Sequence, residues 1–144
     1  MKLSKIKCVT TAKILGHVIN TNESMDEAIK DRLKKAKNAW HAIKNKYITN
    51  KEINTKLRLQ LFDSLIGSIL LYSLHIIQLN KTSISKIQSF YSKCVRTISE
   101  GYYHENNIKI NNKTIRIKHN IPTIESKLHY YRMNMLYRLK KPNQ

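Results

Sequence analysis

Apolar residues recur three and four positions apart through most of this chain, the repeat that places side chains on one face of an α-helix. Between residues 23 and 100 the repeat forms three stripes, which predict three helices. Leu70 and Leu71 widen the second stripe, so we expect the second helix at the centre of the fold. The stripes are Ile29, Leu33, Ala36, Trp40, Ile43 and Tyr47; Ile53, Leu57, Leu61, Leu65, Ile69 and Tyr72; and Ile84, Ile87, Tyr91, Cys94 and Ile98.

Short motifs indicate where these helices begin and end. The segment Thr49-Asn50-Lys51-Glu52 fits a capping box, in which two side chains satisfy free N–H groups, so the second helix should begin there. Gly101 follows the third stripe at the position of a C-terminal stop. Pro122 stands near the start of a last helix, residues 122–141, whose stripe is Ile124, Leu128, Tyr131, Met135 and Leu139.

Two further segments have features of β-structure. Residues 9–19 are rich in β-branched side chains and end at a polar turn, which predicts a short hairpin within residues 1–22. In residues 101–121, isoleucines alternate with polar residues on both sides of Asn111-Asn112, so this segment is either a basic loop or a small hairpin. The predicted fold is a single, mainly α domain over residues 1–144, a bundle of about four helices with a short N-terminal β-hairpin.

The charge of the chain narrows the class of partner. There are 27 Lys and Arg against nine Asp and Glu, a net charge of +18. Such a chain repels itself, and nucleic acid is the commonest polyanion that relieves the repulsion, because neutralised phosphates release counterions. An anionic membrane surface is the alternative, but the basic residues run along the whole chain and form no single cluster. Residues 59–79 are rich in Leu and Ile, yet Asp63 and His75 interrupt them, so we expect a core helix in place of a membrane span, and no membrane partner.

The basic residues on exposed helix faces and in the 101–121 segment are the candidate contacts to RNA phosphates. Tyr102 and Tyr103 are candidates for stacking on unpaired bases. The alternative for both groups is a side chain that contacts only solvent. This alternative is less favoured after Asn106, because Glu125 is the only acid in that part of the sequence. The candidate basic residues are Lys30, Lys34, Lys35, Lys37, Lys44, Lys46, Lys51, Lys93, Arg96, Lys109, Lys113, Arg116, Lys118, Arg132, Arg138, Lys140 and Lys141.

Side chains for catalysis do not converge in the sequence. Nucleotidyl transfer needs carboxylates that hold two metal ions, whereas the only adjacent acids, Asp26 and Glu27, fit the first turn of a helix. Neither Cys8 nor Cys94 stands at a metal-ligand spacing from any of the six His, and the three Gly form no phosphate-binding loop. We therefore expect no catalytic residues, no metal and no cofactor.

Several motifs occur in an order that resembles a known family. Leu15-Gly16 precedes the first helix, and the second helix ends in Leu70-Leu71-Tyr72-Ser73. The third contains Phe90-x-x-Lys93-Cys94-Val95-Arg96-x-Ile98, and Ile121-Pro122-Thr123-Ile124-Glu125 opens the last. This order resembles the thumb and primer-grip region of reverse transcriptases of non-LTR (LINE-like) retrotransposons, downstream of the catalytic palm. Ile14 and Ser73 depart from the aromatic residue and the glycine of the family pattern.

The resemblance implies a thumb without its palm, whose helices close on a template–primer duplex through backbone contacts, with no polymerase activity unless another chain supplies the palm. Because the chain begins at Met1, we expect a captured fragment that serves as a non-catalytic RNA-binding structural subunit of a ribonucleoprotein, among other proteins. A mitochondrial or cytoplasmic particle is expected, above all a ribosome, since ribosomal proteins are commonly small and strongly basic. The alternative is the thumb of a split or degraded reverse transcriptase that acts with a palm subunit in trans.

Overall fold

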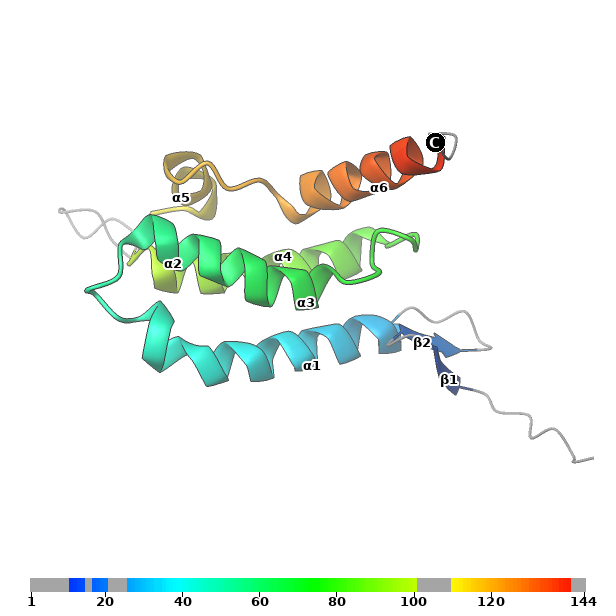
Figure 1. The fold of residues 1–144 in the computed structure, drawn as a ribbon, viewed down its shortest axis with the longest axis horizontal. Helices are drawn as coiled ribbons and strands as arrows, with labels where there is room; N and C mark the ends of the chain where they lie inside the picture. Colours follow the sequence, from blue (N-terminus) through cyan, green and yellow to red (C-terminus); the bar gives the residue numbers. More distant parts are fainter. Residues whose placement is uncertain (1–10, 15–16, 21–25, 101–109, 141–144) are drawn as a thin grey trace, which may run out of the picture.

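Helices make up the body of the molecule, so the prediction of a mainly α chain is confirmed. The structure, a computed structural model, describes residues 11–14, 17–20, 26–100 and 110–140. Its helical layers run from α1 through the joined α2 and α3, with α4 behind them, to α6 (Figure 1). The elements are β1 (Thr11–Ile14), β2 (His17–Asn20), α1 (Asp26–Ile43), η1 (Lys44–Ile48), α2 (Thr55–Phe62), η2 (Asp63–Gly67), α3 (Ser68–Leu71), α4 (Lys81–Ile98), α5 (Asn112–Lys118) and α6 (Ile124–Lys140).

The two strands precede the helices and pair antiparallel. Thr11 lies opposite Asn20 and Ile14 opposite His17. The part of the chain that the structure describes contains no further strand. A pair of such short strands is marginal by itself, and the residues of the hydrophobic core lie in the helices and their connections.

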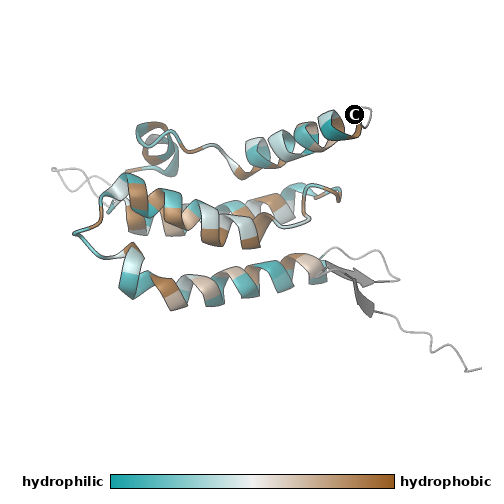
Figure 2. Ribbon diagram, viewed as in Figure 1, coloured by the Kyte–Doolittle hydropathy of each residue, from teal (hydrophilic) through white to brown (hydrophobic). Residues whose placement is uncertain are grey.

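Aromatic rings from three helices meet in the core. Trp40 of α1 packs edge-on against Phe62 of α2, with ring centroids 5.7 Å apart. On its other side Phe62 contacts Tyr91 of α4 at 5.0 Å. Figure 2 shows apolar positions alternating with hydrophilic ones around each helix, as expected of helices that bury one face.

The second helix begins later than predicted. Asn54 caps α2, because its side chain accepts a hydrogen bond from the N–H of Lys56 at 2.8 Å. The capping box predicted at residues 49–52 is wrong. There, Asn50 accepts a hydrogen bond from the N–H of Glu52 at 2.9 Å and closes a turn between η1 and α2.

The apolar stripe of the second helix also differs from its prediction. Phe62, Ile66 and Leu70 are fully buried, whereas the predicted Leu57 and Leu65 are 49% and 46% exposed. A spacing of four residues drifts around an α-helix, which has 3.6 residues per turn. The wider π-helical turn η2, which follows Phe62, corrects this drift and keeps the three buried side chains on one face.

Residues 112–118 form a helix, so the alternative of a small hairpin around Asn111-Asn112 is wrong. Asn111 is the N-cap of α5, since its side chain accepts hydrogen bonds from the N–H and the hydroxyl of Thr114 at 2.8 and 3.0 Å. Ile115 is buried and Ile117 is exposed, which is the one-sided burial of a short surface helix. An asparagine pair therefore marks a helix start here and no two-residue turn.

The ends of α4 and α6 follow local rules. Asn80 caps α4 by accepting a hydrogen bond from the N–H of Ser83 at 2.7 Å. Glu100, at φ 52°, takes the left-handed conformation just beyond the end of α4, while the predicted stop at Gly101 lies outside the described residues. The side chain of Gln88 accepts a hydrogen bond from the N–H of Ile124 at 2.8 Å and joins the start of α6 to α4.

Only the first turns of α6 use its predicted apolar stripe. Ile124 and Leu128 are buried, whereas Tyr131 and Leu139 are 38% and 75% exposed, which corrects their assignment to the core. No helix in the described ranges has the length and apolar composition of a membrane span.

Replacing Phe62 with Ala should lower the free energy of unfolding by about 3–5 kcal/mol, because the substitution leaves a cavity between Trp40 and Tyr91. Leu57→Ala is the matched control on the same helix, where the side chain is half exposed and the loss should be well under that. Urea unfolding followed by the fluorescence of Trp40, the single tryptophan, measures both. Equal losses in the two variants would contradict the central position of Phe62.

Candidate nucleic-acid interface

Five lysines gather where α1 and α4 lie side by side. An open groove between the two helices is lined by Leu33 and Lys37 of α1 and by Lys81, Thr82, Ser85, Lys86 and Ser89 of α4. A second shallow depression shares Leu33 and Lys37 and adds Lys30, Lys34 and Asn38. We call the joined surface the lysine groove. None of its lining residues is acidic.

The fold of each helix explains why the lysines face outward. Ile29, Ala36 and Trp40 turn the apolar face of α1 to the core, which leaves Lys30, Lys34 and Lys37 on successive exposed turns. In the same way α4 buries Ile87, Tyr91 and Cys94 and presents lysines and hydroxyl side chains on its other face.

Acids lie near the lysine groove in the sequence only at its Lys30 end, where Glu27 and Asp31 are close, and Asp31 pairs with Lys35. Residues 32–51 and 64–99 contain no Asp or Glu, and both walls of the groove fall within or directly beside these stretches. Lys ammonium and Ser or Thr hydroxyl groups are donors that commonly contact phosphate oxygens. The surface is therefore chemically suited to a polyanion.

Sequence analysis identified three of the five groove lysines and missed two. Lys81 and Lys86 were not among the candidates, because only the packing of α4 beside α1 brings them next to Lys37. A usable signal was present in the chain: Lys81, Ser85 and Ser89 stand four residues apart, on one face of the predicted third helix.

The other candidate contacts lie away from the lysine groove or outside the described residues. Lys35 is paired with Asp31 of the preceding turn at 2.6 Å. Lys109, Lys141, Tyr102 and Tyr103 fall in residues that the structure does not describe. The remaining basic candidates are spread over η1, the turn after it, the far end of α4, α5 and α6: Lys44, Lys46, Lys51, Lys93, Lys113, Arg116, Lys118, Arg138 and Lys140.

Two arginines predicted to contact RNA bind the chain itself. Arg96 donates to the backbone oxygen of Ile110 at 2.7 Å and to the side chain of Asn112 at 2.6 Å. Arg132 donates to the backbone oxygens of His75 and Ile77 at 3.0 and 2.9 Å. A planar guanidinium reaches two acceptors at once, which suits it to holding connections between helices. Both guanidinium groups are therefore engaged within the chain, and their contact with RNA stays a prediction.

Arg32 and Arg58 also contact other parts of the chain. Arg58, which is 5% exposed, donates to the backbone oxygen of Ile48 at 3.1 Å and to the hydroxyl of Thr55 at 3.0 Å. Arg32 is 6% exposed and lies over the ring of Tyr72 at 4.5 Å. The described arginines near the core are thus structural, and the exposed cations of the groove are lysines.

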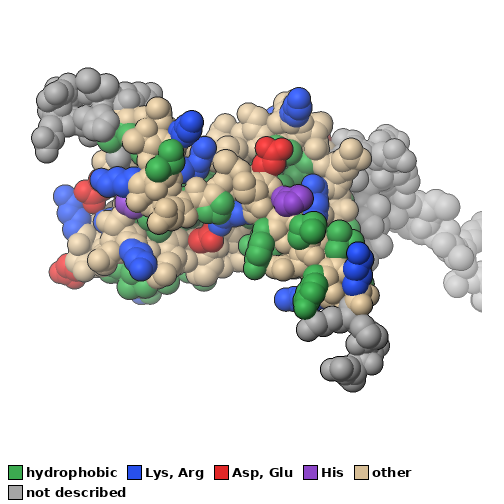
Figure 3. Space-filling model, turned by 90° about the horizontal axis from the view of Figure 1, so that it is seen from above, with side chains coloured by type: hydrophobic (Ala, Val, Ile, Leu, Met, Phe, Trp, Pro, Cys, Tyr) green, Lys and Arg blue, Asp and Glu red, His purple; other side chains and the backbone are tan. Residues whose placement is uncertain are grey.

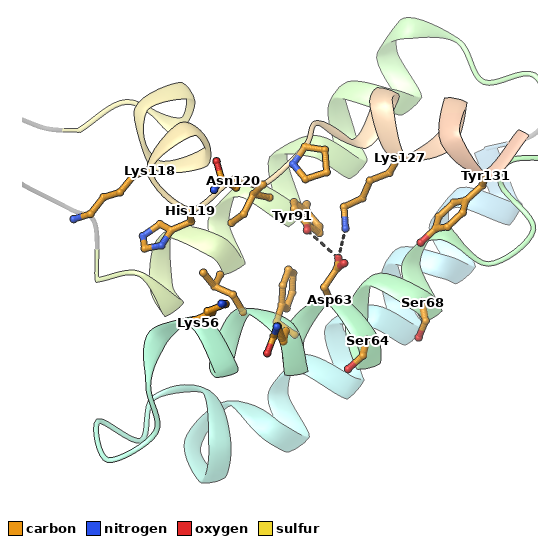
Figure 4. Close-up of a pocket in the computed structure, with 15 residues that line it drawn as sticks. Lys56, Asp63, Ser64, Ser68, Tyr91, Lys118, His119, Asn120, Lys127 and Tyr131 are labelled. Carbon is orange, nitrogen blue, oxygen red and sulfur yellow. Dashed lines mark hydrogen bonds and ion pairs between the residues drawn. The ribbon is translucent and has the colours of Figure 1, made fainter. Parts of the chain in front are cut away.

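A second polar feature is a pocket of about 730 Å³ bounded by α2, α4 and the connection from α5 to α6. Figure 4 shows Tyr91 and Lys127 both pointing toward Asp63. The Asp63 carboxylate accepts a hydrogen bond from the Tyr91 hydroxyl at 3.0 Å and another from the Lys127 ammonium. Lys127 is 10% exposed, so this carboxylate neutralises a nearly buried charge.

Gly67 makes room for that carboxylate. A Cβ at position 67 would lie 2.7 Å from the Asp63 side-chain oxygen, one turn earlier on the same helix. Burial, followed by the charge of Asp63, raises the pKa of Tyr91 well above its usual range, so its hydroxyl remains a donor to the carboxylate. The three groups form a fixed polar link between α2, α4 and α6.

The pocket rim is basic. Lys56 and Lys118 line it, together with His119 and Asn120 (Figure 4). In the ranges that the structure describes, no three His, Cys, Asp or Glu side chains come close enough to hold a metal ion.

Burial raises the pKa of Cys94 to about 12, so its thiol stays protonated on the apolar face of α4.

Comparison with known proteins gives no relative for this chain. No protein-family model matches it, and no curated protein or solved structure matches it either.

The stability of the protein should depend on His119 in mildly acidic solution. Burial, and then the charge of Lys118, lowers the pKa of His119 below the value of about 6.5 expected in the unfolded chain. The unfolded state then binds more protons below that pH, so the free energy of unfolding should fall as the pH drops from 7 to 5. His119→Gln should flatten this dependence, measured by urea unfolding at each pH, while His129→Gln on the exposed side of α6 serves as control. An unchanged pH dependence in His119→Gln would contradict the assignment.

Proposed function

We propose that this chain is a non-catalytic RNA-binding subunit of a ribonucleoprotein, and that the lysine groove contacts the phosphate backbone of structured RNA. The observation that carries the proposal is the gathering of Lys30, Lys34, Lys37, Lys81 and Lys86 on one surface whose lining includes no acid. Each neutralised phosphate would release counterions, which supplies most of the affinity of such contacts.

The shape of the surface supports backbone contacts over base recognition. Lys30, Lys34 and Lys37 present one cation on each successive turn of α1, about every 5.4 Å along the helix axis. An ammonium on a flexible stem is a point charge that binds phosphate without the planar geometry used to read base edges. Double-stranded RNA is recognised largely through shape, phosphates and 2′-hydroxyls. The proposed ligand is therefore a duplex or a duplex-like region of folded RNA.

The resemblance to the thumb of non-LTR reverse transcriptases supports the same class of ligand. In that family the thumb helices close on a template–primer duplex, and a thumb fragment could keep this preference in another particle. We favour a ribosome, of the mitochondrion or the cytoplasm, because a small size and a charge of +18 are common among ribosomal proteins. The second candidate, a thumb that works with a palm subunit in trans, is favoured by the exposed apolar residues of α6, which a second protein would cover.

Reversing three groove charges should weaken RNA binding and its dependence on salt. We expect Lys34→Glu, Lys37→Glu and Lys86→Glu together to lower the affinity for a short duplex RNA by at least ten-fold. The slope of log affinity against log salt should fall by about one for each lost phosphate contact. Fluorescence anisotropy over a series of KCl concentrations measures both quantities.

The matched control reverses three lysines outside the lysine groove, Lys51, Lys113 and Lys140, which are all exposed. Both variants change the net charge by the same amount, so a general polyelectrolyte effect would reduce binding equally. A larger loss in the groove variant supports the interface. Equal losses, or an unchanged affinity in the groove variant, would contradict it.

Sedimentation of the native protein from cell and organelle lysates separates the two candidate functions. Migration with ribosomal particles that shifts after RNase or EDTA treatment is the result expected of a ribosomal subunit. Migration with a polymerase-sized partner that ribosome dissociation leaves unchanged would favour the split reverse transcriptase.

A further inference from the structure

A second surface, remote from the lysine groove, exposes large apolar side chains. Tyr72, Ile76 and Leu139 are 51%, 65% and 75% exposed. Figure 3, which views the molecule from the side of α6, shows hydrophobic side chains gathered over this region. We call this surface the apolar face; it comprises Tyr72, Ile76, Tyr131, Met135 and Leu139.

Exposed apolar residues are ordinary when they are scattered, but a contiguous group of this size marks an interaction site. The apolar face is contiguous because its five members all line one groove of about 620 Å³. One wall of this groove is the end of α3 and the loop after it, with Leu71, Tyr72 and Ile76. The other wall is the second half of α6, with Met135 and Leu139.

The walls of this groove are held in place. Arg132 binds the backbone oxygens of His75 and Ile77 and so ties the loop to α6. The rings of His75 and Tyr131 lie 6.1 Å apart across the same junction. Lys127 bonds to Asp63 one turn before Tyr131. The groove is therefore a preformed feature of the fold, which lowers the ordering cost of binding.

The spacing along α6 fits a helical partner. Tyr131, Met135 and Leu139 stand four residues apart on the groove side, whereas Tyr130, Met133 and Tyr137 lie on the other side of α6. Rows of side chains at these spacings are the ridges that pack into the grooves of another helix. An amphipathic helix laid between α6 and the loop after α3 would cover this row together with Tyr72 and Ile76.

The charge around this groove indicates which kind of partner helix it would bind. The groove is lined by no acid, and Arg138 is its one Lys or Arg. Residues 64–99 and 126–140, which supply both walls, contain no Asp or Glu. A second copy of this chain at +18 would be repelled, whereas a helix with acidic flanks would be attracted. The non-aromatic members Ile76, Met135 and Leu139 also fit a protein helix better than stacked bases, which need aromatic rings.

We infer that the apolar face docks an acidic amphipathic helix of a partner protein. This goes beyond the proposed RNA contact, because the two surfaces are separate: α6 and α1 lie on opposite sides of the layer formed by α3 and α4 (Figure 1). The chain can then hold RNA and a second protein at the same time.

The test uses a synthetic helical peptide of about 18 residues, with Leu on one face and Glu on its flanks. We expect the full-length protein to bind this peptide in fluorescence anisotropy, and to bind a version with Lys in place of Glu at least ten-fold more weakly. Ile76→Ser combined with Leu139→Ser should weaken binding of the acidic peptide by at least ten-fold. Both side chains are exposed, so the variant should keep the stability of the parent protein.

Ile117→Ser is the matched control, since Ile117 on α5 is 66% exposed and lies outside the apolar face. It should leave peptide binding unchanged, and all of these variants should keep their affinity for duplex RNA. The proposed RNA interface is tested separately, by the lysine groove variants, so the failure of one proposal can be distinguished from the failure of the other.

Four outcomes would overturn the inference. They are no measurable binding of the acidic peptide, equal binding of the acidic and basic peptides, peptide binding that the Ile76 and Leu139 substitutions leave intact, and a homodimer in ultracentrifugation that these substitutions dissociate. Weaker binding of single-stranded RNA in the variant, without an effect on the peptide, would also overturn it and identify a base-stacking surface.

Discussion

The neighbouring side chains of Phe62 and Asp63 join the four long helical segments of this molecule. Phe62 lies between the rings of Trp40 and Tyr91 and so connects α1, α2 and α4 through apolar contact. The next residue, Asp63, accepts hydrogen bonds from Tyr91 and from Lys127 and adds α6 through polar contact. The two modes of contact are interdependent, because the phenol of Tyr91 takes part in both. The position of every surface discussed above follows from this junction.

Lys and Arg have different tasks in this fold. The chain contains 21 Lys and six Arg, and four of the Arg bind backbone oxygens, side chains or a ring within the protein. A guanidinium satisfies two acceptors in a fixed geometry, whereas an ammonium is strongly hydrated and remains at the surface. Arg is also the side chain that most often reads guanine edges in nucleic acids. A protein that uses most of its Arg internally is therefore better suited to holding RNA by its backbone than to selecting a sequence.

Local patterns predicted the positions of the helices well, but predicted less well which face of each helix is buried. The repeats around Trp40 and Tyr91 locate α1 and α4, because each helix buries a single stripe. The repeat of four in the second helix fits two adjacent stripes, because Leu61, Leu65 and Ile69 directly precede the buried Phe62, Ile66 and Leu70, and the predicted stripe was the wrong one of the two. For the segment around Asn111-Asn112 the sequence left a basic loop and a small hairpin as alternatives, although the spacing from Asn111 to Thr114 also fits an N-cap.

The candidate interface was predictable in part for a related reason. Periodicity places Lys30, Lys34 and Lys37 on the outer face of α1, so they could be named from the sequence. Lys81 and Lys86 join them only through tertiary packing, which periodicity does not encode. The internal use of Arg96 and Arg132 was equally hidden, because their acceptors are backbone oxygens and side chains of distant loops.

The absence of a side chain at Gly67 has a consequence for how this sequence can change over time. Any other residue at that position would bring a Cβ against the carboxylate of Asp63. A displaced carboxylate would leave Lys127 charged and nearly buried without its counterion. Positions 63, 67 and 127 should therefore vary together in descendants of this gene. A lineage that loses the glycine should carry a compensating change at Asp63 or Lys127, the pair that attaches α6.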